Sequence, residues 1–343
     1  MLPKSLVLPS FILLYGCVGY RTPLDELPKP DAGVPCVPGV SSLTHAEPTV
    51  MFVLDRSGSM NTAMANGRNS QSRWQALGSA LGSALPSVDN AVAIGALFFP
   101  TAGAGTQNCT VPSRADLTPA VGNVASLIRL MSGSATSGAT PTATAIDTAA
   151  KLVLSLRTAT AARALVLATD GAPNCNLSLN VGTCRCSVST GRACPSTVEC
   201  LDDTRAEQTI AKYQAAGVST YVIGIQSQGD TQFADVLNAM AVAGGRPRSG
   251  AAESYYAASS ETELSAALAA IRDQVGACTF LSSSVPDPNG AIVLNLDGVD
   301  VPAEAWMWGN VNNGELVLLG DACTSAAAER SPSLTATVQC SGG

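Results

Sequence analysis

Residues 50–59 read Val-Met-Phe-Val-Leu-Asp-Arg-Ser-Gly-Ser, and they give the strongest indication of the fold class. Its first half is a continuous apolar run, which is typical of a strand buried on both faces of a parallel sheet. Its second half places Asp55, Ser57 and Ser59 at alternate positions of a turn that Gly58 eases. Ligands of open α/β sheets bind outside the carboxyl ends of the strands. The stretch therefore predicts a central strand followed by a binding loop.

Similar apolar runs recur downstream and alternate with helical patterns. Strand candidates lie at 91–99, 165–168 and 220–225, with a weaker one at 254–258. Apolar residues spaced by three, four and seven mark one face of each expected helix; the six stripes begin at Trp74, Val124, Ile146, Ala206, Phe233 and Leu264. This alternation predicts a doubly wound α/β domain over residues 49–276, with a mostly parallel sheet flanked by helices.

Two more oxygen-bearing side chains are expected beside the first loop. Thr140 precedes Pro141 at the start of a helical stripe, and Asp170 follows the strand candidate 165–168. Hydroxyl and carboxylate oxygens are hard ligands, which suit magnesium, manganese or calcium rather than zinc or copper. We expect Mg²⁺, or alternatively Mn²⁺ or Ca²⁺, at a site formed by Asp55, Ser57, Ser59, Thr140 and Asp170.

From residue 49 to about residue 275 the chain resembles a von Willebrand factor type A domain. The five oxygen donors carry the resemblance, because they match the metal-ion-dependent adhesion site of that family one by one and in order. The resemblance implies that Ser57, Ser59 and Thr140 bind the metal directly, and that the two aspartates act through bound water. The usual Gly-Gly-Thr of the family is Gly-Ala-Thr at 138–140 here, a departure that keeps the ligand.

A site with so few direct carboxylates leaves the charge of its ion incompletely neutralised. Our hypothesis is that an Asp or Glu of a protein partner completes the coordination, which predicts adhesion or scaffolding. The alternatives are a structural envelope protein whose metal only stabilises the fold, and a metal-dependent hydrolase. The hydrolase is disfavoured because the chain has no Gly-x-Ser-x-Gly or phosphate-binding lysine motif, and because its one histidine, His45, precedes the first strand. We therefore expect no enzyme.

Composition restricts the partners further. Hydrophobic residues make up 46% of the chain and charged residues 13%, so the chain must bury a core and fold. The formal net charge of −7 argues against a nucleic-acid partner.

The first residues predict export. Residues 1–16 combine Lys4 with a short apolar run, as in a signal peptide, and Leu-Tyr-Gly-Cys at 14–17 resembles a lipobox apart from Tyr15. We expect Cys17 to carry a lipid anchor, with ordinary cleavage as the alternative. Val18 after the cysteine resembles the signal for delivery to the outer membrane, so the protein is expected to face the periplasm or the cell exterior. Residues 17–48 are rich in proline and predict an extended tether.

Ten cysteines remain beyond Cys17, and an even number in an exported chain predicts disulfides rather than zinc. Five of them lie in an insertion at 173–203, for which Cys109 is a candidate outside partner. This insertion is either a specificity surface beside the metal site or a stiffened loop without a partner. Residues 277–343 predict a small, disulfide-rich β module with strands at 291–296, 316–319 and 334–338, and with Trp306 and Trp308 in its core.

Overall fold

We describe the fold from a computed structural model of the 343-residue chain. The expected signal peptide, Cys17, Cys36, Cys340 and the first part of the expected tether lie outside the described residues. The structure describes residues 39–45, 48–64, 70–103, 105, 107–156, 162–187, 194–226, 233–248, 251–276, 278–282, 291–310, 314–329 and 332–339. Within these ranges, no helix combines the length and the apolar character that crossing a bilayer requires.

A six-stranded sheet forms the centre of the larger unit, in the order β4-β3-β2-β5-β6-β7. Its neighbours pair in parallel except for β4, which runs antiparallel to β3 at the edge. The strands are β2 (Thr49–Asp55), β3 (Ala93–Phe99), β4 (Leu117–Ala120), β5 (Arg163–Thr169), β6 (Val218–Ile225) and β7 (Tyr256–Ala258). The predicted mostly parallel sheet is thus confirmed.

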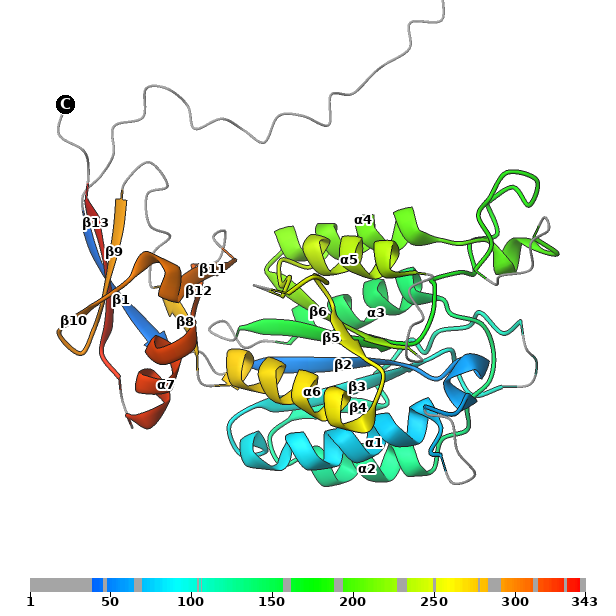
Figure 1. Cartoon of the computed structure of the whole chain (residues 1–343), viewed down its shortest axis with the longest axis horizontal. Coiled ribbons are helices and arrows are strands. Elements are labelled where there is room, and N and C mark those ends of the chain that lie inside the picture. The colour runs from blue at the N-terminus through cyan, green and yellow to red at the C-terminus, as the bar shows by residue number, and fades with distance from the viewer. Residues whose placement is uncertain are drawn as a thin grey trace, which may run out of the picture.

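Three helices cover each face of this sheet (Figure 1). One layer holds α1 (Arg73–Ala84), α2 (Val124–Ser132) and α6 (Glu261–Gly276). The other holds α3 (Thr142–Leu154), α4 (Asp203–Ala215) and α5 (Ala234–Ala243). The doubly wound α/β architecture follows the sequence prediction.

The central strand β2 shows why the sequence folds this way. All seven of its residues are buried. Val50, Phe52 and Leu54 pack in the core that α1, α2 and α6 share, whereas Met51 and Val53 pack in the core on the opposite face. Successive side chains of a strand point to opposite faces, so a continuous apolar run supplies both cores at once.

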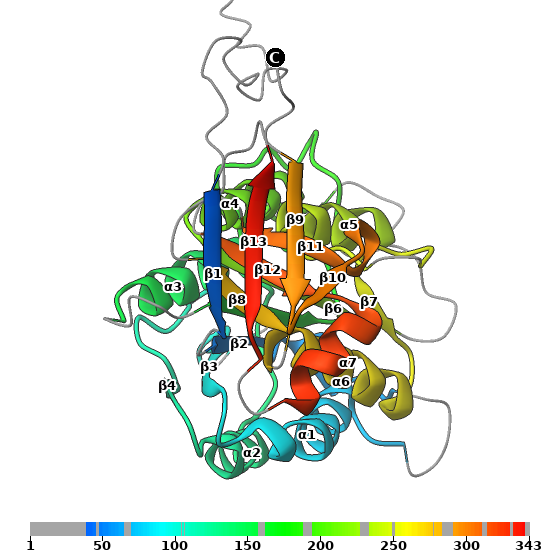
Figure 2. The same ribbon diagram turned by 90° about the vertical axis from the view of Figure 1, so that its left-hand side faces the viewer.

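A second sheet of seven strands forms the smaller unit, in the order β10-β9-β13-β1-β8-β12-β11, and every neighbouring pair is antiparallel (Figure 2). Helix α7 (Gly320–Ala328) packs against it, with Ala326 in the core. The strands are β1 (Gly39–His45), β8 (Thr279–Ser282), β9 (Ala291–Leu296), β10 (Val299–Val301), β11 (Trp306–Asn310), β12 (Glu315–Leu318) and β13 (Leu334–Gln339).

Strand β1 corrects the sequence interpretation of residues 17–48 as tether. It pairs with β13 on one side and β8 on the other, so a segment from before the larger unit completes the expected C-terminal β module. Leu43 is the one buried residue in β1, and a strand with one buried side chain shows no apolar alternation in the sequence.

The smaller unit also differs from the predicted module in other respects. Its described residues hold one disulfide, Cys278–Cys323, so a disulfide-rich module stays a prediction. Helix α7 was not expected, because its small residues, four of them alanines, form no apolar stripe. Trp306 and Trp308 lie half-buried against the core and contact each other edge to face, with ring centroids 5.8 Å apart.

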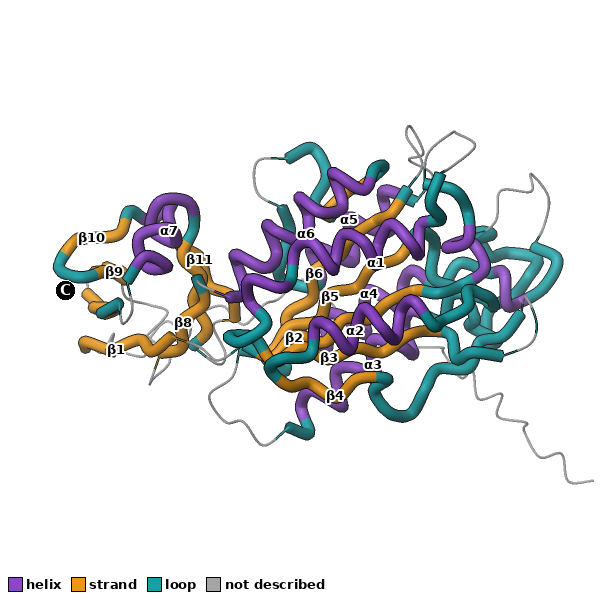
Figure 3. Tube along the Cα trace, turned by 90° about the horizontal axis from the view of Figure 1, so that it is seen from below, coloured by secondary structure: helices purple, strands orange, loops and turns teal. Residues whose placement is uncertain are grey.

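The two units adjoin at the amino ends of the central strands. β1 leads into β2, α6 leads into β8, and a buried ion pair joins Arg246, which follows α5, to Glu315 of β12. Figure 3 shows the smaller sheet at one end of the molecule and the long loops of the larger unit at the other. The loops after β2 and β5 therefore project away from the second sheet.

Candidate functional site

Asp55 ends β2 and lies fully buried at the base of the predicted site. Its Oδ1 accepts a hydrogen bond from the Ser57 backbone N–H over 2.8 Å, which closes the turn. Its Oδ2 accepts a hydrogen bond from the hydroxyl of Thr169, the last residue of the neighbouring strand β5, over 2.6 Å. Both carboxylate oxygens are thus fixed by the two strands whose ends form the site.

The two serines of the first loop form a hydrogen-bonded row that ends at Asp170. The Oγ atoms of Ser57 and Ser59 are 3.0 Å apart, and the Ser59 hydroxyl donates to Oδ1 of Asp170 over 2.8 Å. A short 3₁₀ turn, Gly58–Asn61, directs this part of the chain across the ends of the strands. Side chains 111 residues apart in sequence are brought together here.

A guanidinium joins this cluster from α1. Arg73, the first residue of that helix, donates from Nη1 to Oδ2 of Asp170 over 2.7 Å. The helix begins there because Ser72 and Gln75 form a capping box, which satisfies backbone groups at the helix start. Arg73 was not expected from the sequence, although its position soon after the loop is a signal that could have indicated it.

The Thr140 loop contacts the first loop through the backbone. Gly58 N–H donates to the carbonyl of Gly138 over 3.0 Å. Gly138 has a φ of +93°, and a Cβ there would lie 2.7 Å from Cγ of Pro100. Glycine is therefore required two residues before the threonine, whereas Ala139 occupies the position of the second family glycine without difficulty.

These residues border a cavity of about 300 Å³. Four of the five predicted ligands line it, namely Ser57, Ser59, Thr140 and Asp170. Asp55 lies behind Ser57 and is linked to the cavity by its hydrogen bond to the Ser57 backbone N–H. The oxygen-only donor set fits a hard divalent cation, with hydroxyls in front and the Asp55 carboxylate behind them.

The two carboxylates disfavour each other's charged form. Burial, together with the nearby Asp170, raises the pKa of Asp55 from 3.8 to about 7. Burial also raises the pKa of Asp170, and the Arg73 guanidinium opposes that rise. A cation placed between the two carboxylates would stabilise both in their charged form. The site is therefore arranged to gain from positive charge.

The cysteine-rich insertion forms one wall of the cavity. Ser187, Val198 and Glu199 of the insertion line it together with Phe233. The insertion is stiffened by Cys184–Cys200 and Cys186–Cys194, and Cys109–Cys175 ties it to the loop after β3. The expected disulfides and the expected outside partner Cys109 are both found. Although Cys184, Cys194 and Cys200 lie close enough to hold a metal, these disulfides occupy their sulfurs.

Asn174 connects the insertion to the Thr140 loop, and sequence reasoning missed it. Its Oδ1 accepts from the Thr140 N–H over 2.7 Å, its own N–H donates to the Thr140 carbonyl over 2.9 Å, and its Nδ2 donates to the hydroxyl of Ser187 over 3.2 Å. A lone asparagine in a loop gives no sequence signal for such a role. Thr169 was missed for the same reason, because a threonine at a strand end is common.

His45 lies before strand β2, whereas this cluster follows it. It sits at the end of β1, exposed, with its ring edge to face against Phe280 at 5.3 Å between centroids. All of β2 separates it from the Asp55 loop. It is exposed as expected, but it belongs to a strand and not to a linker.

Most of the larger unit is similar to a known domain family. The sequence profile of the von Willebrand factor type A domain matches residues 49–270. No curated protein matches the chain.

Several solved structures are similar to this chain at low sequence identity. The pilus adhesin SpaC from Lactobacillus rhamnosus GG is 14% identical, with a TM-score of 0.49, and the match covers 86% of this chain and 39% of that one. The PilB minor pilin from Streptococcus sanguinis is 16% identical, with a TM-score of 0.47, over 67% of this chain and 61% of that one. The conserved hypothetical protein BatB from Bacteroides thetaiotaomicron is 13% identical, with a TM-score of 0.39, over 65% and 98%. This chain thus spans less than two thirds of the two pilus proteins.

Proposed function

Because the chain belongs to the von Willebrand factor type A domain family, we propose that it binds a protein ligand through a divalent cation held at the Asp55 loop. One observation carries the proposal: the hydroxyls of Ser57 and Ser59 and the carboxylate of Asp170 form a hydrogen-bonded chain at the edge of one cavity. Thr140 lines the same cavity from a third loop. Three separate loops thus contribute hard oxygen ligands to one place.

The residues divide into two roles toward the cation, which we propose is Mg²⁺ in preference to Mn²⁺ or Ca²⁺. Ser57, Ser59 and Thr140 would bind it directly, while Asp55 and Asp170 would act through water. A bound cation would supply an electrophilic centre for an Asp or Glu of the partner. Asp55 orients the Ser57 turn through its contact with the backbone N–H, and Ser59 orients Asp170.

The insertion supports a role in choosing the partner. Val198 and Glu199 of the insertion line the same cavity as the proposed ligands, so they lie close to a group that binds the cation. We propose that these residues favour a ligand whose acidic group stands beside an uncharged or basic neighbour, since a second acidic group would meet Glu199. Exchanging the insertion for an unrelated loop should change partner choice; an unchanged set of partners would remove this role.

We further propose that the protein works at the cell envelope as a lipoprotein. The lipobox-like residues 14–17 and the proline-rich segment that follows support anchoring through Cys17 at the outer membrane. Adhesion or scaffolding at the envelope would require no catalytic turnover. The described lining of the cavity contains no His, Lys or Cys side chain, which supports a binding role over a hydrolytic one.

Arg73 favours a second candidate, a scaffold whose site needs no metal. Its guanidinium already neutralises Asp170 from within the protein. In that case the loops would stabilise the fold, and the role at the envelope would depend on the two packed units and not on a bound cation. Metal titration separates the two candidates, because the scaffold binds partners equally well with and without a cation.

Calorimetric titration of the purified protein with MgCl₂, followed by pull-down from envelope extracts with and without a chelator, tests the proposal. We expect Mg²⁺ binding that Thr140→Ala and Ser59→Ala weaken strongly, and partner capture that the chelator abolishes. Ser83→Ala on the exposed side of α1 is the matched control and should bind as the wild type does. Capture that survives both the chelator and Asp55→Ala would contradict the cation-dependent function.

A further inference from the structure

Two asparagines from different loops form hydrogen bonds to the Thr140 loop. The backbone carbonyl of Asn108 accepts a hydrogen bond from the N–H of Ala139 over 3.0 Å. Asn174 makes two hydrogen bonds to Thr140, one through its side chain and one through its own backbone N–H. The backbone on each side of the predicted metal-ligating hydroxyl is therefore fixed by residues of two other loops.

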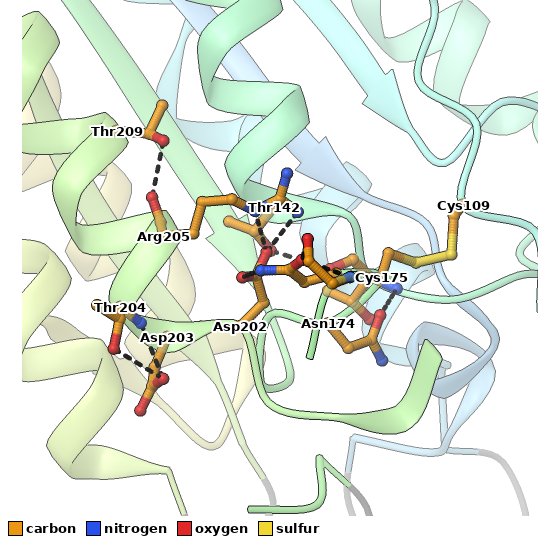
Figure 4. A network of polar contacts seen from close by, with 12 residues as sticks. Cys109, Thr142, Asn174, Cys175, Asp202, Asp203, Thr204, Arg205 and Thr209 are labelled. Atoms are coloured by element: carbon orange, nitrogen blue, oxygen red, sulfur yellow. Dashed lines mark hydrogen bonds and ion pairs between the residues drawn. A yellow bond between two sulfur atoms is a disulfide. The ribbon is translucent and has the colours of Figure 1, made fainter. Parts of the chain in front are cut away.

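Each of these asparagines directly precedes a cysteine of the same disulfide. Cys109 and Cys175 are bonded to each other although they lie 66 residues apart in sequence. The bond joins the loop after β3 to the loop after β5, and Figure 4 shows Asn174 beside it. The Thr140 loop is thus held by two residues whose neighbours in sequence are joined by one covalent cross-link.

The surrounding contacts make the asparagines rigid supports. Asn108 is fixed within its own loop, where Nδ2 donates to the carbonyl of Thr101 over 2.8 Å and Oδ1 accepts from the N–H of Thr110 over 3.0 Å. Asn174 is buried. Cys175 has a φ of +73°, a conformation that a non-glycine residue keeps only when its surroundings impose it.

We propose that the Cys109–Cys175 disulfide, together with Asn108 and Asn174, is a clamp that sets the position of Thr140 at the cavity. Asn174 is its positioning residue, since it acts on the site through the backbone of Thr140. A ligand group must be held within about 0.5 Å of its working position to bind a cation well. Loss of the clamp therefore weakens the cation site without removing any of its ligands. The consequence for the cation rests on the proposed function, whereas the clamp itself does not.

The test measures the clamp first in the absence of metal. Hydrogen exchange of the Ala139 and Thr140 amides is compared between the wild type and the Cys109→Ser/Cys175→Ser double variant. The matched control is Cys278→Ser/Cys323→Ser, which opens a disulfide of similar loop length, 45 residues, in the other unit. We expect at least tenfold faster exchange of both amides in the first double variant alone.

A single substitution keeps the test decisive if that double variant folds poorly. Asn174→Ala leaves the disulfide intact and should speed exchange of the Thr140 amide at least tenfold. Asn176→Ala is its control, because Asn176 belongs to the same loop and bonds to Asp202 instead. Equal protection of the Thr140 amide in Asn174→Ala and the wild type would overturn the clamp.

The second readout is the Mg²⁺ affinity of the same variants. We expect about tenfold weaker binding in Asn174→Ala and in Cys109→Ser/Cys175→Ser, and unchanged binding in the two controls. Faster exchange with unchanged affinity would overturn the clamp's role at the site. A wild type that binds no Mg²⁺ would contradict the proposed function, while the exchange rates would still decide whether the clamp exists.

Discussion

Arg73 forms a buried ion pair with Asp170, the carboxylate that closes the predicted cation site. The Nη1–Oδ2 distance is 2.7 Å, and the Asp170 side chain is fully buried. The pair places a permanent positive charge beside Asp170, which lines the cavity of the predicted site. If the site binds a cation as proposed, Arg73 of α1 should lower its affinity through charge repulsion.

Replacing this cation should have opposite effects on folding and on metal binding. We expect Arg73→Gln to destabilise the metal-free protein by about 3 kcal/mol, because it leaves a buried carboxylate without its charged partner. We also expect Mg²⁺ to bind about tenfold more tightly, since a like charge near the metal is removed. Urea denaturation with and without Mg²⁺ measures both. Weaker Mg²⁺ binding would show that Arg73 orients Asp170 rather than competing with the metal.

The stability of the metal-free protein should depend on pH through Asp55. Its pKa is raised to about 7 by burial and by Asp170, against 3.8 when unfolded. Between these values the folded state binds more protons, so the contribution of Asp55 to stability is fully present below about pH 4 and is lost as the pH rises to 7, by at most about 1.4 kcal/mol per unit. Urea midpoints from pH 4 to 8 test this. Asp55→Asn should flatten the profile, and Mg²⁺ should stabilise the wild type more at pH 8 than at pH 5.

Gly138 should not tolerate a side chain. Its φ is positive, and a methyl group at this position would lie 2.7 Å from Pro100, so Gly138→Ala should cost about 1–3 kcal/mol and displace the Thr140 loop. Gly171→Ala is the matched control, since a Cβ at Gly171 meets nothing within 4 Å. Thermal unfolding compares the two variants. Equal stability of both would mean that the loop relaxes without cost.

The buried pair Arg246–Glu315 should tie the two units into one cooperative structure. Glu315→Gln is expected to cost about 3 kcal/mol, because it leaves the Arg246 guanidinium buried without a counter-charge. Arg246→Met/Glu315→Leu removes both charges and should recover much of that loss. Chemical denaturation followed by tryptophan fluorescence reports on this, since Trp306 and Trp308 lie in the smaller unit. A double variant no more stable than Glu315→Gln would contradict the expected cost of the unpaired Arg246 charge.

Much of the larger unit could be predicted from the sequence because its strands are buried on both faces. The apolar runs at β2, β5 and β6 indicate that burial directly. The apolar stripes of the helices indicate which helix face packs against the sheet. Strand β1 could not be found in this way, since its partners β8 and β13 lie more than two hundred residues further along the chain. The antiparallel edge strand β4 was missed because its residues alternate only between half-buried and exposed.

The sequence alone predicts which oxygen-bearing residues form the site, because Asp55, Ser57 and Ser59 follow a strand at a spacing that directs them to one point. Thr140 precedes a helix, and Asp170 follows another strand. The residues that support or oppose these side chains are visible only in the folded chain. Arg73 and Asn174 reach the site through contacts between segments that are distant in the chain, with Asp170 and Thr140 respectively. Local patterns of polarity indicate which side of a segment is exposed and which is buried. They do not indicate which distant side chain supplies a hydrogen bond or a charge.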